Sequence, residues 1–125
     1  MLAVLTALTT MGTAANATTL AAAGYGGITQ NTADCILYNA GTSKVSVSGA
    51  KIASVFSPLP PTFNNCVSLA AGAFCTIQAN IVNNNISHAC QVDVSSSLDV
   101  RGSLVIRNVD PKFGVDQVLI DVPLR

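Results

Sequence analysis

The sequence predicts an all-β domain, a disulfide-bonded sandwich of two sheets with about seven strands. Three observations lead to this expectation: apolar residues recur at every second position, turn-forming residues separate these stretches, and the chain has four cysteines. At 125 residues, the chain is long enough for one domain and too short for a multidomain enzyme. Only 10% of the residues are charged and the net charge is zero. Nucleic acids and anionic lipids are bound mainly through excess Lys and Arg, so neither is expected as a partner.

Residues 1–17 are expected to be a secretory signal peptide. Residues 2–8 form a short apolar run, and Ala15-Asn16-Ala17 has the small-x-small pattern of a signal-peptidase site, which predicts cleavage after Ala17. A transmembrane anchor is the alternative, but it needs about 20 mainly apolar residues, and threonines interrupt this run repeatedly. We therefore expect a secreted or periplasmic protein of the cell envelope.

Residues 18–33 are small and rich in glycine, with Gly24, Gly26 and Gly27 at their centre. This composition fits either a flexible lead or an irregular first edge strand. We take the flexible lead as the expectation, so the predicted β-sandwich domain covers residues 34–125.

From residue 34 onwards, the chain alternates with the period of two that marks half-buried strands. Turn-forming residues at 39–43 separate a first strand, 35–38, from a second, 44–48, and residues 49–50 are expected to form the next turn. Later strands are expected at 75–81, 90–95 and 118–122, and turns at 83–85 and 110–114. About seven strands in such a short chain are typical of a two-sheet sandwich.

The four cysteines are expected to form two disulfides. An even number of cysteines behind a secretory signal indicates an oxidising compartment, and the lack of a Cys-x-x-Cys pair argues against the alternative of a zinc site. Four cysteines allow three connectivities. Cys66 and Cys75 bracket a short loop in which Gly72 permits a tight reversal, and Cys35 and Cys90 each begin an alternating strand. We therefore predict the pairs Cys66–Cys75 and Cys35–Cys90.

Residues 56–65 form a long proline-rich stretch that carries three large apolar side chains, those of Phe56, Leu59 and Phe63. These side chains could form a contact surface for a partner. Alternatively, the two phenylalanines fold back over the open end of the sandwich, with the prolines fixing the path of the chain, and we prefer this second interpretation.

The sequence shows no catalytic, cofactor-binding or metal-binding set of residues, so we expect no enzyme and no cofactor. His88 is the single histidine. A triad needs a nucleophile and a carboxylate beside it, and the adjacent Ser87 points away from it on an extended chain. We therefore expect His88 in a surface loop. The other candidates are interpreted as solvated surface charges: Asp93, Asp99, Asp110, Asp116, Asp121, Arg101, Arg107 and Arg125.

The segment 64–77, with its Cys…Leu-Ala-x-Gly-x-x-Cys-x-Ile pattern, resembles a segment of hydin-like and choice-of-anchor immunoglobulin-like domains of bacterial surface proteins. Residues 35–47 are similar to the opening strand, turn and second strand of those domains, and the similarity covers roughly residues 34–107. The resemblance implies an immunoglobulin-like, noncatalytic sandwich at the cell envelope, in which Cys66 and Cys75 bond to each other. It carries over no active-site residue.

Three classes of function are considered. The leading hypothesis is a noncatalytic secreted or periplasmic domain that acts in binding or structure, with a protein or another envelope component as its partner. The second is a fibre- or pilin-like subunit of an oligomer, in which residues 18–33 add a strand to the open sheet edge of a neighbour. The third, which we do not expect, is a small hydrolase or an enzyme inhibitor.

Overall fold

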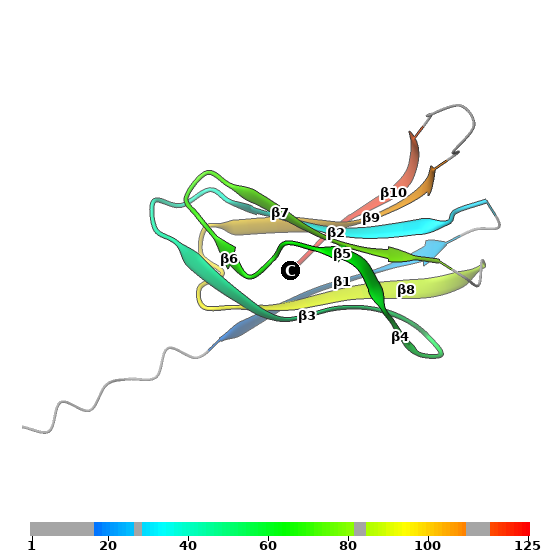
Figure 1. The fold of residues 1–125 in the computed structure, drawn as a ribbon, viewed down its shortest axis with the longest axis horizontal. Coiled ribbons are helices and arrows are strands. Elements are labelled where there is room, and N and C mark those ends of the chain that lie inside the picture. The colour runs from blue at the N-terminus through cyan, green and yellow to red at the C-terminus, as the bar shows by residue number, and fades with distance from the viewer. Residues whose placement is uncertain (1–16, 27–28, 82–84, 110–115) are drawn as a thin grey trace, which may run out of the picture.

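The alternation of apolar residues produces a sandwich of two antiparallel sheets (Figure 1). The computed structural model describes residues 17–26, 29–81, 85–109 and 116–125, with only the backbone described at 116–120. The first sheet has the order β1–β8–β3–β4, with β6 paired to β3 beside this path: β1 (Thr18–Gly26), β8 (Ile86–Val94), β3 (Val45–Ser54), β4 (Pro58–Leu59) and β6 (Ser68–Leu69). The second has the order β10–β9–β2–β7–β5: β10 (Asp116–Pro123), β9 (Val100–Val109), β2 (Thr32–Asn39), β7 (Phe74–Asn80) and β5 (Pro61–Asn64).

The predicted fold class is confirmed. Ten strands and no helix are found in the described ranges, against about seven expected strands. Seven of them have at least seven residues, and one of these seven, β1, lies in the segment that was expected to be a flexible lead. The remaining three, β4, β5 and β6, have two to four residues each. Strands this short carry too little alternation to be recognised from a sequence.

Residues 18–26 form a regular strand, so the expectation of a flexible lead is wrong for this segment. β1 pairs with β8 along its whole length, from Thr18 opposite Val94 to Gly26 opposite Ile86. Leu20 points into the core, where it is buried, and the backbone ladder with β8 adds to this burial. Together they outweigh the low strand propensity of the alanines and glycines. The first sheet therefore begins at residue 18 rather than 34, and the predicted signal peptide lies outside the described residues except for its last one.

The expected turn at residues 49–50 is instead a β-bulge inside β3. Ser48 pairs with Asp93 and Lys51 pairs with Gln91, so two residues of β3 oppose a single residue of β8. Gly49 has a φ of 57°, a left-handed conformation that glycine adopts without steric cost. The glycine that signalled a turn thus bends a strand that continues to Ser54.

The core lies between the two sheets, and a disulfide crosses it. Inward-pointing residues of both sheets form one buried cluster, with these among its fully buried members: Leu37, Ile52, Ile77, Val92, Val94, Leu104 and Ile106. Cys35 of β2 is bonded to Cys90 of β8 within this cluster. Cys66 is bonded to Cys75 of β7. Both predicted pairs are therefore confirmed.

The chain also joins the two sheets along both sides of the sandwich. On one side, β4 pairs with β3 of the first sheet and β5 pairs with β7 of the second, so the chain crosses between the sheets at Pro60. On the other side, Ala21 and Arg125 exchange two backbone hydrogen bonds, of 3.0 and 3.2 Å. The preceding Leu124 still donates to the Gly102 carbonyl of β9 at 2.8 Å. The last two residues therefore link one sheet to the other.

The two disulfides are expected to differ in their contribution to stability. The Cys35→Ala/Cys90→Ala variant should unfold with a free energy lower by about 4 kcal/mol, because that bond closes a loop with a sequence separation of 55. The Cys66→Ala/Cys75→Ala variant should lose about 2.7 kcal/mol, because its separation is 9. Urea unfolding followed by circular dichroism measures both, and a larger loss in the second variant would contradict the loop-closure argument.

Candidate functional site

The outer face of the second sheet carries the polar and aromatic side chains that are organised around one another. Because successive residues of a strand point to opposite faces, the burial of Cys35 in the core places Asp34 and Ile36 of β2 on the outer face. Gln78 of β7 and Val105 of β9 are the partners of Asp34 on the two neighbouring strands. These side chains therefore lie side by side at the centre of the sheet.

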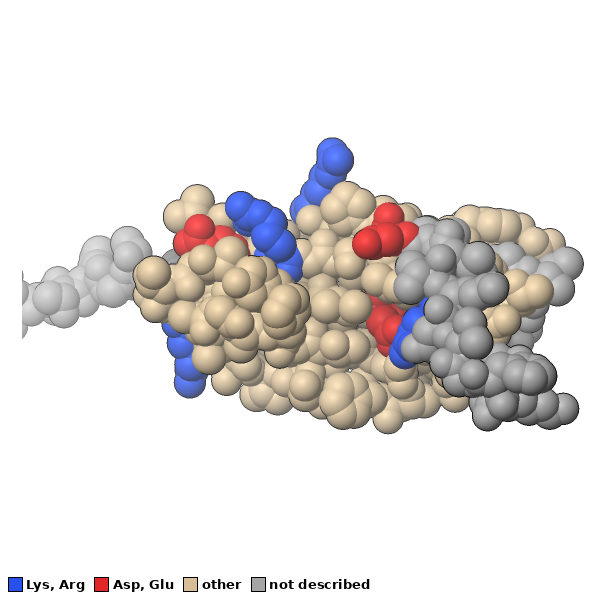
Figure 2. Space-filling model, turned by 90° about the horizontal axis from the view of Figure 1, so that it is seen from above, with Lys and Arg blue, Asp and Glu red and all other residues tan. Residues whose placement is uncertain are grey.

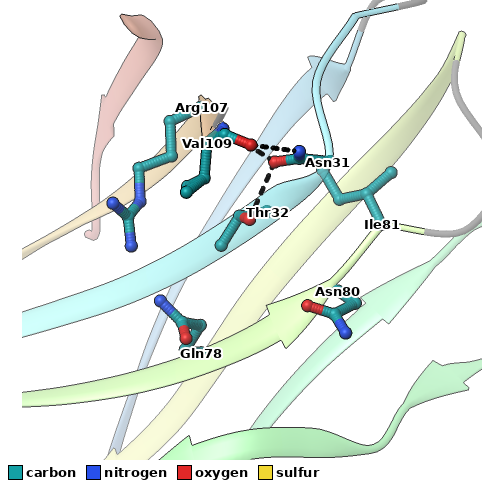
Figure 3. A pocket seen from close by; sticks show the side chains of 7 residues that line it. All are labelled: Asn31, Thr32, Gln78, Asn80, Ile81, Arg107 and Val109. Carbon is teal, nitrogen blue, oxygen red and sulfur yellow. Dashed lines mark hydrogen bonds between the residues drawn. The ribbon is translucent and has the colours of Figure 1, made fainter. Parts of the chain in front are cut away.

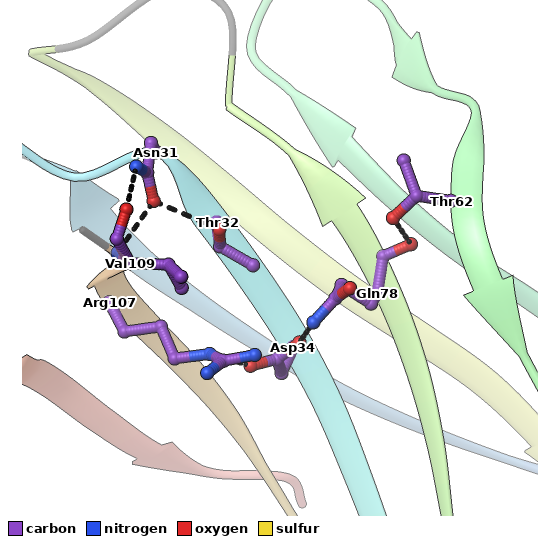
Figure 4. A network of polar contacts seen from close by, with 7 residues as sticks. All are labelled: Asn31, Thr32, Asp34, Thr62, Gln78, Arg107 and Val109. Carbon is purple, nitrogen blue, oxygen red and sulfur yellow. Dashed lines mark hydrogen bonds and ion pairs between the residues drawn. The ribbon is translucent and has the colours of Figure 1, made fainter. Parts of the chain in front are cut away.

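An ion pair with a third partner forms the middle of this face (Figure 4). Asp34 accepts a hydrogen bond from Arg107 Nε on Oδ2 and one from Gln78 Nε2 on Oδ1, the latter at 2.9 Å. The side chains of Asp34 and Arg107 are only 6% and 19% exposed, although they lie on an outer face. A carboxylate removed from water needs such partners. The arrangement holds the side chains of three strands in fixed positions.

Asn31, just before β2, attaches the start of this strand to the end of β9. Its Nδ2 donates to the Val109 carbonyl at 2.8 Å, and its Oδ1 accepts from the Val109 amide at 2.9 Å (Figure 3). The same oxygen accepts from the Thr32 hydroxyl at 2.9 Å. The Asn31 side chain is therefore held on both of its polar atoms.

Two open hollows lie next to each other on this face. The first, of about 610 Å³, is lined by Asn31, Thr32, Gln78, Asn80, Ile81, Arg107 and Val109 (Figure 3). The second, of about 410 Å³, is lined by Asp34, Ile36, Phe63, Thr76, Gln78, Val105 and Arg107. Because they share Gln78 and Arg107, we treat them as one feature, the outer-face trough. Each has a volume in the range of about 300–1,000 Å³ that is common for ligand sites.

A stacked aromatic pair, with one exposed and one half-buried ring, lies further along the same face. Tyr38 and Phe74 are partners on β2 and β7, and their rings stack with centroids 4.5 Å apart. Phe74 is 67% exposed, and both rings line a further hollow of about 240 Å³ with Arg101. Aromatic side chains held in water beside a concave surface are typical of contact sites.

The charged side chains of the described residues do not gather into a patch of one sign. Figure 2 shows acidic and basic groups scattered over a largely uncharged face. No group of three or more His, Cys, Asp or Glu residues suitable for a metal ion is found in the described ranges. The same part of the chain contains no helix long and apolar enough to cross a membrane.

The structure separates the three residues of the predicted contact loop. Phe56 and Phe63 are 74% and 51% exposed, so the interpretation that they fold back over the sandwich is wrong. Leu59 alone packs against the core, because β4 pairs with β3 at this point. Phe63 faces outward on β5 and lines the outer-face trough. A contact role for this segment stays a prediction.

His88 is buried, not in a surface loop as expected. β8 already begins at Ile86, so His88 occupies an inward position two residues before the buried Cys90, and it is 1% exposed. Burial lowers the pKa of His88, and a hydrogen bond with the backbone of Ile86 opposes this effect in part. Its Nδ1 has no hydrogen-bond partner in the described part of the chain, and a Cβ on Gly26 would lie 3.2 Å from that atom.

Arg107 is not a solvated surface charge either, since it is paired with Asp34 in the centre of the sheet. The sequence analysis did not single out Asp34. Residues 32–38 carry a signal that could have identified it. In this run, the outward positions, which alternate with the core-facing ones, also include apolar side chains, Ile36 and Tyr38. An acidic residue within such an outer row needs a nearby cation.

The fold and this face together define a small β-sandwich with an internal disulfide and a polar trough on one outer face. No protein-family model matches the chain, and neither the curated proteins nor the solved structures contain a match. The resemblance to hydin-like and choice-of-anchor domains stays a prediction.

The burial of His88 predicts that stability falls in mild acid. The folded state holds the pKa of His88 below the ordinary value of 6.5, so the unfolded chain binds the proton first as the pH falls. The stabilisation is complete above the ordinary pKa and is lost below it, by at most about 1.4 kcal/mol per pH unit. Urea unfolding at several pH values should show that the free energy of unfolding falls with the pH below pH 6.5. The slope of this dependence should be smaller in His88→Gln. Equal slopes in both proteins would contradict the assignment.

The ion pair between Asp34 and Arg107 is expected to contribute to folding. Asp34→Ala and Arg107→Ala should each lower the free energy of unfolding by about 2–3 kcal/mol, because each removes one side of an ion pair that is largely shielded from water. In the double variant, the coupling energy should be about 1–3 kcal/mol.

An exposed polar pair provides the matched control for this cycle. Thr19 donates to Asp93 at 2.6 Å on the surface of the first sheet. A cycle of Thr19→Ala and Asp93→Ala should give a coupling energy under about 1 kcal/mol. Similar coupling in the two cycles would mean that burial does not strengthen the Asp34–Arg107 pair.

Proposed function

We propose that this protein is a noncatalytic binding domain, secreted or periplasmic, that holds a protein or another envelope component on the outer face of its second sheet. The observation that carries the proposal is the stacked Tyr38–Phe74 pair beside the outer-face trough, in which the Phe74 ring is exposed and the Tyr38 ring is half-buried. Exposed aromatic rings are costly in water and are enriched where proteins meet their partners.

The rigidity of this face supports the proposal. β9, β2 and β7 are interior strands of the second sheet, each paired on both sides, and β2 is bonded to the other sheet through Cys35. A surface held in its binding conformation loses little conformational entropy when a partner binds.

The export of the chain is supported by its disulfides and by the start of its first strand. Two disulfides indicate an oxidising environment outside the cytoplasm. β1 begins at Thr18, directly after the predicted cleavage site, so removal of residues 1–17 would leave the first sheet complete. The resemblance to domains of bacterial surface proteins agrees with this location.

The structure offers less support to the other two classes. A fibre subunit that donates residues 18–33 would have to remove β1 from β8 and release Ala21 from Arg125. A hydrolase would need an accessible acid–base group, whereas His88 lies buried within the first sheet. We therefore favour binding over assembly or catalysis.

Photo-crosslinking tests this proposal. The photoreactive residue p-benzoylphenylalanine replaces Phe74 in the exported protein, and irradiation in the envelope fraction of the producing cells should yield a discrete crosslinked product. The control places the same residue at Val55, which is 62% exposed in the turn between β3 and β4. Products from Val55 alone, or from neither position, would contradict the assignment of the binding face.

A further inference from the structure

We propose that the outer-face trough binds a neutral carbohydrate, an uncharged oligosaccharide. This inference rests on the proposed binding function and names the chemical class of its ligand. It is argued from the charge balance of the lining, its hydrogen-bonding groups and its one aromatic wall.

The charge balance of the trough disfavours an ionised ligand. Among the described residues that line it, Asp34 and Arg107 are the two with charged side chains, and they bind each other. An anion would have to compete with Asp34 for Arg107, and a cation would have to compete with Arg107 for Asp34. An uncharged ligand does not have to compete with either residue.

The remaining polar groups suit a ligand with many hydroxyls. Asn31, Gln78 and Asn80 carry amides, and Thr32 and Thr76 carry hydroxyls. An amide carries two donor hydrogens and an acceptor oxygen on neighbouring atoms, which matches a sugar hydroxyl, itself both donor and acceptor. Asn31 and Gln78 use part of this capacity on their protein partners, so a ligand meets the groups that remain. Asn80 is exposed, and its side chain makes no hydrogen bond with another described residue, so its amide is free to bind.

Two of these amides are already fixed in position. Gln78 is held by Asp34, and Asn31 is held by Val109 on both polar atoms. Figure 3 shows that the side chains of Gln78 and Arg107 point toward one another from β7 and β9 across β2. A ligand that bonds to them therefore does not pay the entropy of ordering them.

The apolar part of the trough provides the complementary surface. Phe63, which is 51% exposed, lies at the second hollow together with Ile36 and Val105. The face of an aromatic ring carries partial negative charge and attracts the C–H groups of a sugar ring. Polar groups at one end and an aromatic wall at the other fit a chain of more than one sugar unit.

A protein strand fits this trough less well. β2, β7 and β9 are each paired on both sides, and the edge strand that contributes Phe63, β5, has only four residues and begins with Pro61. The trough therefore offers little free backbone edge to which an extended peptide could add. A ligand in the trough must therefore be recognised by side chains, and an oligosaccharide offers many hydroxyls that can hydrogen-bond to them.

The experiment presents the purified, disulfide-bonded protein to an array of uncharged glucan, mannan and chitin oligosaccharides and of sulfated or carboxylated ones. At least one uncharged oligosaccharide should bind, and its affinity, measured by titration calorimetry, should change little between about 0.05 and 0.5 M salt. Asn80→Ala and Phe63→Ala should each weaken it by about 5- to 10-fold. Both residues are exposed, so neither substitution threatens the fold.

Two matched variants serve as controls. Phe56→Ala removes an equally large exposed ring outside the trough, and Gln91→Ala removes an amide from β8 of the other sheet. Both should bind within about twofold of the unchanged protein. Binding confined to the charged saccharides, no binding to any uncharged one, or binding unaffected by the two trough variants would each overturn the inference. If p-benzoylphenylalanine at position 74 still gives a crosslinked product in that case, the proposed function stands and only the ligand class is wrong.

Discussion

The bond between Cys35 and Cys90 is the constraint on which the outer face of the second sheet depends. It lies in the core and joins β2, the middle strand of the second sheet, to β8 of the first. Once Cys35 is held inward, the period of two leaves Asp34 and Ile36 only the outer face. A slip of one residue would carry Asp34 into the core, away from its partners Arg107 and Gln78. The same bond that stabilises the sandwich thus sets which side chains lie on its outer face.

Burial on both sides gives β2 its unusual composition. Its inward row packs in the core, and its outer row is covered by neighbours from β7 and β9, so Thr32 and Asp34 are buried on an outer face. Asp34 is tolerated there because Arg107 and Gln78 bond to it. The stability of the central strand and the shape of the trough therefore have a common origin in this cluster.

The sequence predicted features that depend on neighbours along the chain. Alternation revealed most of the long strands, and the cysteine positions at the expected strand starts and around a short loop predicted both disulfides. It could not predict what depends on distant partners. Gly49 was assigned to a turn because only the pairing with β8 shows that β3 continues past it. His88 was placed in a loop because the early start of β8 comes from pairing with β1. Asp34 was missed because Arg107, its partner, is 73 residues away.

The hydrogen bonds between Ala21 and Arg125 have a consequence for behaviour at high concentration. β1 is an edge strand, and a flat edge of small residues would offer a template on which other copies could stack without limit. Arg125 occupies the middle of that edge and interrupts the template. On the opposite side, the short, proline-containing β5 forms the edge of the second sheet, and proline cannot donate a backbone hydrogen bond. The sandwich therefore carries its own protection against aggregation at two of its exposed edges.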